Sequence, residues 1–246
     1  LARLAKDERN SSTGFQALYA LGEVDMERKK MDSARERFET LTKSDRSEAQ
    51  SVVPAAFSRV GQIEVVASNW VAAASNYEQA FLKSDDPSFR LKCVDELMMV
   101  YMKLDKANTL ADKLRDWAGK NAKTRLGEAL LMDVAILWQR AGKQDQAIQA
   151  FLSFFEAYPN GALNDRAHFQ FGWVFLENKQ YESAISEYQK AAERTKNPQL
   201  QADAWLKIGD LQLERQQFDA AVAAYARCSQ VKGADPAKIE QALYQA

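Results

Sequence analysis

Residues 205–225, with the sequence WLKIGDLQLERQQFDAAVAAY, hold two markers of a helical hairpin. The first marker is an apolar residue followed by glycine, Ile208-Gly209. The second is an alanine followed four residues later by an aromatic residue, Ala221 and Tyr225. Four residues make about one turn of an α-helix, so Ala221 and Tyr225 share a helix face. The polar stretch between the markers predicts a turn. Together they predict two helices packed against each other.

The same two markers recur along the chain. The alanine and aromatic pairs are Ala34/Phe38, Ala73/Tyr77, Ala147/Phe151 and Ala184/Tyr188, and the pairs ending in a small residue are Leu21-Gly22, Val60-Gly61, Val134-Ala135 and Phe171-Gly172. We assign a weaker third copy to Asp95, Ala107 and Ala111, where Asp95 takes the small-residue position and Ala111 the aromatic one. The marker alanines then stand at positions 34, 73, 107, 147, 184 and 221, at intervals of 39, 34, 40, 37 and 37 residues. Six hairpins are therefore expected.

Helix starts support this register. Asp86-Pro87, Asn197-Pro198 and Asp235-Pro236 each place a capping side chain before a proline that suits the first helical position. Thr13 and Gln16 have the spacing of a capping box, which predicts that Thr13 caps the first long helix.

The two markers resemble the tetratricopeptide repeat, in which W-x2-L-G-x2-Y precedes A-x3-F and a proline. The resemblance implies an all-α fold, a right-handed α-solenoid of about six helix-turn-helix hairpins, in which stacking buries the apolar face of each hairpin. We expect one solenoid domain over residues 1–246. Its repeats are expected at about 15–48, 54–87, 88–121, 128–161, 165–198 and 202–235, with 1–8 and 236–246 as parts of flanking helices.

A narrower resemblance covers the later repeats. The stretch from Phe151 to Gly161, FLSFFEAYPNG, is followed by Phe171-Gly172 and by Tyr181 and Ala184. It is similar to repeats in bacterial envelope proteins, including the outer-membrane assembly lipoprotein BamD and the Tol-Pal-associated periplasmic protein. The resemblance implies a bacterial origin and suggests the periplasm or cell envelope, with the cytoplasm as the alternative.

Composition excludes several classes of function. The chain has 46% hydrophobic and 27% charged residues, which suits a folded helical protein. Thirty-three basic and 34 acidic residues leave a net charge of −1, so no broad positive field is available for nucleic acid. No apolar run approaches the roughly 20 residues that span a bilayer, and direct membrane insertion is not expected.

The sequence offers no constellation for catalysis. Its single histidine, His168, stands where the repeat pattern has a large packing residue, so we interpret it as part of the core. Cys93 and Cys228 are expected to be core residues too far apart to bridge. One histidine and two distant cysteines cannot form a structural zinc site. We therefore expect no enzyme activity, no metal and no cofactor.

In tetratricopeptide proteins the first helix of each hairpin lines the concave face, so the resemblance implies a binding groove there. His168, Phe171, Gly172 and Phe175 account for the packing stripe of one such helix. A second apolar stripe is not required by hairpin packing, and we expect it to form an apolar strip for a partner across three repeats. Its members are Phe169, Trp173 and Leu176, with Met132, Ile136, Leu206 and Leu213 at matching positions, and its polar flanks include Arg140, Arg166 and Gln170.

The resemblance also suggests one specific function to test, the binding of chaperone tails by a clamp. That clamp needs Lys and Asn one turn apart on an inner helix, meaning the first helix of a hairpin. The sequence departs from that pattern, because no inner pair is Lys with Asn. The pairs read Tyr19/Glu23, Ser58/Gln62, Lys92/Glu96, Met132/Ile136, Phe169/Trp173 and Leu206/Asp210.

These observations favour a non-catalytic scaffold or adaptor that binds a protein or peptide partner in its groove. The alternative is a structural module of a larger bacterial envelope protein, which either self-associates as a homo-oligomer or spaces domains.

Overall fold

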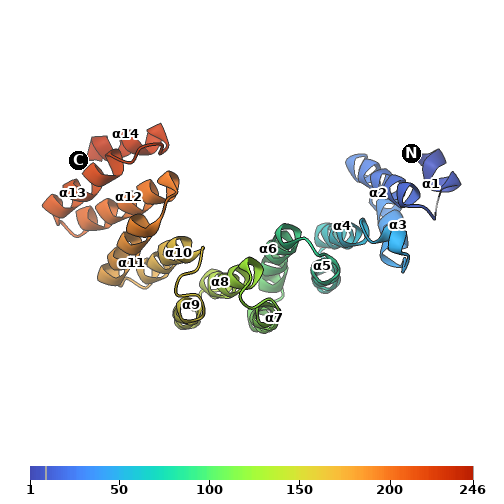
Figure 1. The fold of residues 1–246 in the computed structure, drawn as a ribbon, viewed down its shortest axis with the longest axis horizontal. Helices are drawn as coiled ribbons and strands as arrows, with labels where there is room; N and C mark the ends of the chain where they lie inside the picture. Colours follow the sequence, from blue (N-terminus) through green and yellow to red (C-terminus); the bar gives the residue numbers. More distant parts are fainter. Residues whose placement is uncertain (9, 246) are drawn as a thin grey trace. The chain divides into compact units, whose positions relative to one another are not determined.

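The computed structural model describes residues 1–8 and 10–245. Its helices follow one another in packed pairs, each joined by a short turn (Figure 1). No β-strand occurs in these two ranges. Two compact units divide the chain, residues Leu1–Lys113 and Leu114–Ala246, and the boundary lies inside helix α7 (Ala107–Lys120). The single solenoid domain expected over residues 1–246 stays a prediction.

The first unit contains three helical hairpins up to the middle of α7, preceded by the short helix α1. Its helices are α1 (Ala2–Asp7), α2 (Ser12–Glu27), α3 (Met31–Thr42), the 3-10 helix η1 (Ser47–Ala49), α4 (Val53–Val66), α5 (Trp70–Lys83) and α6 (Pro87–Lys103). Helix α2 packs on α3, and α4 packs on α5. Phe38 and Leu41 of α3 are fully buried with Ala49 and Ala56 in the core that joins the first two hairpins.

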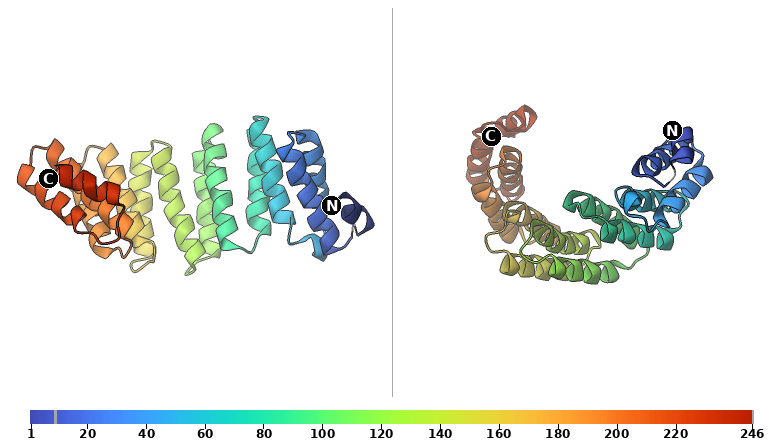
Figure 2. Two further views of the ribbon diagram at one scale, coloured as in Figure 1. Left: turned by 90° about the horizontal axis from the view of Figure 1, so that it is seen from above. Right: turned by 45° about the vertical axis from the view of Figure 1, so that its right-hand side comes forward.

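The second unit contains three hairpins and a final helix. Its helices are α8 (Arg125–Arg140), α9 (Gln144–Ala157), α10 (Asn164–Glu177), α11 (Tyr181–Arg194), α12 (Pro198–Glu214), α13 (Phe218–Ser229) and α14 (Pro236–Gln245). Within this unit, consecutive helices lie side by side in Figure 2, and α8 packs on α9, α10 on α11 and α12 on α13. The predicted all-α solenoid of helical hairpins is therefore confirmed.

All six hairpins turn through the same backbone motif. The turn residues Lys29, Ser68, Asp105, Gly142, Lys179 and Gln216 have left-handed φ values between 54° and 67°. In each turn two backbone hydrogen bonds close a Schellman motif. At Lys179, its N–H donates to the Leu176 carbonyl at 2.9 Å, and the next N–H, of Gln180, donates to the Phe175 carbonyl at 2.9 Å.

These turns correct the register expected for the third hairpin. In the other five hairpins the marker alanine lies five residues after the left-handed residue, as Ala184 follows Lys179. Five residues after Asp105 stands Leu110, not Ala107. Leu110 is fully buried and Asp95 is exposed, so Asp95 is not at a packing position. With position 110 replacing 107, the intervals become 39, 37, 37, 37 and 37 residues.

The marker glycine leaves room for an aromatic ring of the second helix in each of four hairpins. A Cβ placed on Gly172 would lie 2.8 Å from ring atoms of Tyr188, inside van der Waals contact. The same relation holds between Gly22 and Phe38, Gly61 and Tyr77, and Gly209 and Tyr225. The glycine therefore lets the aromatic ring of the second helix lie against the backbone of the first.

Three of the four predicted caps are present. The side chains of Asp86, Asn197 and Asp235 each accept a hydrogen bond from the N–H two residues later, at 2.9 to 3.0 Å. The prediction that Thr13 caps the first long helix is wrong, because helix α2 begins at Ser12. Its cap is Ser11, whose Oγ accepts from the Gly14 N–H at 3.1 Å. The capping residue therefore lies one helical position before the first turn, where a free N–H needs an acceptor.

Candidate partner-binding face

Helix α10 carries two neighbouring faces. The packing face is the one that the sequence predicts, since Phe171 is 4% exposed and Gly172 is buried. The Phe171 ring stacks on Phe151 of α9 at a centroid distance of 5.2 Å. The second face carries Phe169 and Trp173, four residues apart and hence one turn apart on the same side.

Trp173 is the most exposed aromatic side chain of α10, at 36% of its surface. Its indole Nε1 donates a hydrogen bond to Oε1 of Glu177 one turn further along, at 3.0 Å. The ammonium of Lys207, on the neighbouring helix α12, lies 5.4 Å from the ring centroid, within range of a cation–π interaction. The indole N–H thus has a hydrogen-bond partner within the protein, and the part of the ring that is exposed to solvent is apolar.

Phe169 and Leu176 lie deeper than Trp173. Both are half-buried and pack against the core of the last two hairpins. The Phe169 ring lies 5.2 Å from that of Tyr188 on α11, so much of its surface serves the hairpin itself.

The expected apolar strip is narrower than the sequence pattern predicts. Met132 is 6% exposed and Leu206 is 8% exposed, so both lie among the core residues. Ile136 is half-buried, and only Leu213, at 40%, is as open as Trp173. Met132 and Leu206 each lie 37 residues from Phe169 in the sequence and so occupy the same position in their own hairpins. In the fifth hairpin the side chain at this position, Phe169, contacts Tyr188 of the second helix. The outer surface of the strip therefore centres on Trp173.

The polar flank residues differ in their surroundings. Arg166 and Arg140 are exposed and Gln170 is half-buried. Arg166 lies in the first turn of α10 beside Asp165, whose carboxylate is already engaged. That carboxylate accepts from the Arg166 backbone N–H at 2.8 Å and from the Thr195 hydroxyl at 2.6 Å.

His168 lies on the packing face of α10 and makes contacts that the sequence did not reveal. Its ring stacks on Phe155 at a centroid distance of 4.3 Å, and its Nδ1 lies 2.6 Å from Oε2 of Glu187. Lys190 donates to the other carboxylate oxygen of Glu187 at 2.6 Å. Burial raises the pKa of the Glu187 carboxyl, but these hydrogen bonds outweigh burial and hold that pKa below its usual value. The histidine is thus a packed side chain that anchors a buried carboxylate.

The two cysteines are buried and free, as the sequence predicts. Burial raises the pKa of the Cys93 thiol to about 12. It also raises the pKa of the Cys228 thiol, which donates to the Ala202 carbonyl at 3.4 Å. Neither thiol has the lowered pKa of a nucleophile.

In the first unit the inner helices are tied together by charge. Arg59 of α4 makes two hydrogen bonds to the carboxylate of Glu23 on α2, at 2.7 and 2.8 Å. Burial raises the pKa of the nearby Tyr19 hydroxyl, although its hydrogen bond with Arg59 works in the opposite direction. The charges of Arg59 and Glu23 are therefore paired with each other between the first two hairpins. In the corrected register the third clamp pair becomes Asp95/Met99, again not Lys with Asn.

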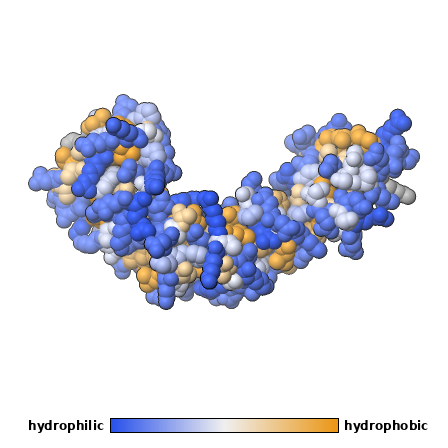
Figure 3. Space-filling model, in the orientation of Figure 1, coloured by the Kyte–Doolittle hydropathy of each residue, from blue (hydrophilic) through white to orange (hydrophobic). Residues whose placement is uncertain are grey.

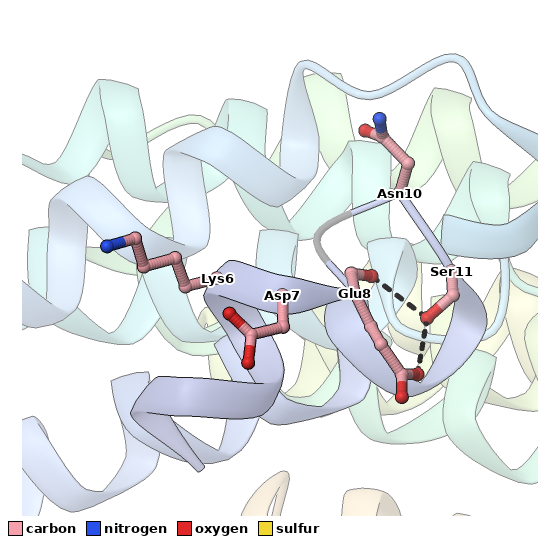
Figure 4. A pocket seen from close by; sticks show the side chains of 5 residues that line it. All are labelled: Lys6, Asp7, Glu8, Asn10 and Ser11. Carbon is pink, nitrogen blue, oxygen red and sulfur yellow. Dashed lines mark hydrogen bonds between the residues drawn. The ribbon is translucent and has the colours of Figure 1, made fainter.

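Two of the surface pockets lie away from Trp173. One, shown in Figure 4, is formed by Lys6, Asp7, Glu8, Asn10 and Ser11, where the Ser11 hydroxyl lies 2.9 Å from the Glu8 carbonyl oxygen. Another lies between α13 and α14 and includes Val231, Ile239 and Leu243. In the two described ranges, no three His, Cys, Asp or Glu side chains are placed to share a metal ion. Of the helices so described, none has both the length and the apolar composition that crossing a bilayer requires.

Comparison with known proteins identifies the repeat. The family model described as "Tetratricopeptide repeat" matches residues 133–199 and 169–228. No curated protein matches the sequence. Among solved structures, BtubC (BKLC) from P. vanneervenii is 12% identical, with a TM-score of 0.55, and the match covers 89% of this chain and 91% of that one.

Two further solved structures are similar. The apo form of RapI is 12% identical with a TM-score of 0.54, over 87% of this chain and 63% of that one. TTC0263, a thermophilic TPR protein of Thermus thermophilus, is 17% identical with a TM-score of 0.46, over 78% and 98%. BtubC and RapI share the fold of this chain. The similarity to the BamD and Tol-Pal-associated proteins stays a prediction. Tetratricopeptide repeats are thus identified in this chain between residues 133 and 228, within an α-solenoid of helical hairpins.

Proposed function

We propose that this chain is a non-catalytic scaffold or adaptor, and that the second unit holds a protein or peptide partner on the inner helices α10 and α12. The observation that carries the proposal is Trp173. Its indole N–H is satisfied by Glu177 and one side of its ring by Lys207, yet more than a third of the side chain is open. We call Arg166, Gln170, Trp173 and Lys207 the Trp173 face.

The side chain of Trp173 is held in place before any partner arrives. Its hydrogen bond to Glu177 and its contact with Lys207 restrict the rotamers of the indole. Immobilising a flexible side chain on binding costs about 0.5–1.5 kcal/mol, and a fixed side chain avoids much of that cost. Tryptophan is also the residue type most enriched among the side chains that dominate binding energy. These features favour Trp173 as an anchor for an apolar side chain of a partner.

A random peptide library displayed on phage tests the proposal and requires no identified partner. Peptides selected on the native chain are expected to bind the Trp173→Ala variant about tenfold or more weakly, as measured by fluorescence anisotropy with the synthetic peptides. Phe218→Ala is the matched control, because Phe218 is 61% exposed on α13 and outside the Trp173 face. Circular dichroism verifies that both variants fold. Equal binding by Trp173→Ala and the native chain would contradict the proposal.

A second candidate is self-association through the last two helices. Phe218 and Val222 of α13 are 61% and 45% exposed, and Leu243 and Tyr244 of α14 are 62% and 93% exposed. Figure 3 shows hydrophobic patches in this part of the second unit, as well as others elsewhere on the same face. Soluble proteins rarely leave large apolar patches uncovered. Light scattering over a concentration series tests this candidate, which predicts an assembly that Phe218→Ala disrupts and Trp173→Ala leaves intact.

A further inference from the structure

We propose that the partner segment is acidic: one of its side-chain carboxylates pairs with Arg166 while a large apolar side chain covers Trp173. This inference rests on the proposed function and specifies the class of partner. The chain as a whole is nearly neutral, so the preference comes from the arrangement of a few charges on one helix face and not from a general field.

Arg166 is the first element of the argument. It is exposed, and among the described residues no carboxylate is paired with its guanidinium. The nearest acid in sequence, Asp165, is held by the Arg166 backbone N–H and by the Thr195 hydroxyl. A cation in the first turn of a helix is not favoured by the helix dipole either. The fold therefore gives Arg166 no internal role, and its guanidinium offers a planar fork that suits a carboxylate.

The second element is its position relative to the tryptophan. Arg166 and Trp173 are seven residues apart on α10 and lie on the same side of the helix, about 10.5 Å apart along its axis. Gln170 lies between them, half-buried, with an amide that can both donate and accept. The three side chains thus form one line of charge, amide and aromatic ring.

The remaining charges give the line a direction. Lys207 adds a second positive charge beside the Trp173 ring. Glu177 lies one turn beyond Trp173 and places a negative charge at the opposite end from Arg166. A partner carboxylate is attracted at the Arg166 end and repelled at the Glu177 end. A segment with an acid on one side of its apolar anchor is therefore oriented on α10 by charge.

The separation predicts the sequence of the partner. A segment in the extended polyproline II conformation rises about 3.1 Å per residue and has three residues per turn, so an acid three residues from the apolar anchor lies on the same side as the anchor. A helical segment rises about 1.5 Å per residue, so its acid stands seven residues away. In both cases the carboxylate comes from a side chain within the segment. This distinguishes the Trp173 face from a receptor for a free carboxyl terminus.

The test is selection from random peptides fused through their carboxyl ends to a phage coat protein, so that no free C-terminus is displayed. On the native chain, selected peptides are expected to be enriched in Asp or Glu three or seven residues from Trp, Phe or Leu. On Arg166→Glu the acidic enrichment is expected to disappear. Lys196→Glu is the matched control, because it makes the same charge change at an exposed site between α11 and α12. It should leave the enrichment unchanged.

A charge exchange completes the test. The best native-selected peptide is expected to bind Arg166→Glu about tenfold more weakly, and a version with Lys in place of its acid should recover binding to that variant. If binding depends on Trp173 but shows no acidic enrichment, or is unchanged in Arg166→Glu, the acidic pairing is overturned and the proposed function stands. If no selected peptide depends on Trp173, both are overturned.

Discussion

A glycine opposite an aromatic ring sets how closely the two helices of a hairpin approach. The ring of Tyr188 occupies the space that a side chain on Gly172 would need. Tyr188 is itself fully buried, so its ring has little room to move away. The small residue and the ring therefore act as one packing unit: a larger residue at position 172 would strain the contact, and a smaller one at position 188 would leave a cavity.

Replacing Gly172 with alanine is expected to lower the free energy of unfolding by about 1 to 3 kcal/mol, because the new Cβ would lie 2.8 Å from the Tyr188 ring. Urea denaturation followed by circular dichroism measures the change. Gly119→Ala is the control: Gly119 lies in helix α7 with no neighbouring atom within 4 Å of its added Cβ. That change should be neutral or stabilise by up to about 1 kcal/mol. Similar midpoints for the two variants would refute this account of the marker.

Glu187 links stability to pH. Because its pKa in the folded chain is lowered, its contribution is present above the unfolded value of about 4.3 and is lost as the pH falls through the folded value. The side chains of His168 and Lys190 are the hydrogen-bonding partners that face it. Glu187→Gln is therefore expected to be less stable than the native chain by about 1 to 3 kcal/mol at pH 7. This difference should shrink below about pH 4.3.

Thermal unfolding of the two proteins from pH 7 to pH 3 measures this difference. Glu193→Gln on the same helix is the control, because Glu193 is exposed and its variant should follow the native curve at every pH. A difference in stability between Glu187→Gln and the native chain that stays constant with pH would show that the carboxylate charge has no part in the contact.

At the scale of elements, the hairpin turn is defined by backbone conformation. Five of the six left-handed positions carry a residue with a side chain, and only the turn at Gly142 has glycine. A left-handed conformation costs a residue with a Cβ roughly 1 kcal/mol relative to glycine. The two Schellman hydrogen bonds and the packing of the hairpin outweigh this cost at each turn.

Exchanging turn residues tests that balance. Lys179→Gly is expected to raise the unfolding free energy by about 0.5 to 1 kcal/mol, and Gly142→Lys to lower it by a similar amount, because both positions have φ near +60°. Urea midpoints of the two single variants provide the measurement. Opposite shifts support the conformational explanation, whereas a loss of stability in Lys179→Gly would show that the lysine side chain itself matters.

The third hairpin shows where sequence reasoning reaches its limit at this scale. Met98, Leu110 and Leu114 occupy its marker positions and are almost fully buried, but none is a small or aromatic residue. The nearest alanines, Ala107 and Ala111, lie three residues earlier. Three residues are close to one helical turn, so the shifted register places nearly the same face inward. The left-handed turn at Asp105, the burial of Leu110 and the exposure of Asp95 distinguish the two registers, and all three are seen in the structure.

The candidate site was predicted less completely than the fold, for a related reason. Helical periodicity identifies the face of α10 that holds Phe169 and Trp173, but it does not show which side chain lies under a neighbouring helix. The contacts that settle this, Lys207 with Trp173 and Phe169 with Tyr188, join residues on different helices. Such pairs have no periodic signal in the sequence. The pairing of His168 with Glu187 was missed for the same reason.

At the scale of the whole molecule, a solenoid carries its stability in contacts between neighbours. In the second unit one such contact is made by Glu128, whose Oε1 accepts the Leu163 N–H at 2.7 Å, across the connection between α9 and α10. Gly161 lies against this carboxylate, and a Cβ there would overlap it. Damage at this junction should remain local, because distant hairpins share no contact with it.

Gly161→Ala tests how far such damage spreads. Native-state hydrogen exchange is expected to rise about tenfold or more in α8 and α10, because displacing Glu128 weakens their junction. Exchange in α2 to α5 of the first unit should be unchanged. Gly119→Ala provides the comparison within the second unit, where the added Cβ meets no neighbour. A uniform rise over the whole chain would show that the two units unfold together.

The uniform spacing of the later hairpins has a consequence for how such a chain changes over generations. From Ala73 onward, the marker positions 73, 110, 147, 184 and 221 follow one another at 37 residues, and each hairpin turn is closed by the same two backbone hydrogen bonds. A duplication or deletion of 111 nucleotides therefore adds or removes one complete hairpin while its neighbours keep their register. Copy number can change in a single genetic event, whereas a new binding face requires substitutions one residue at a time.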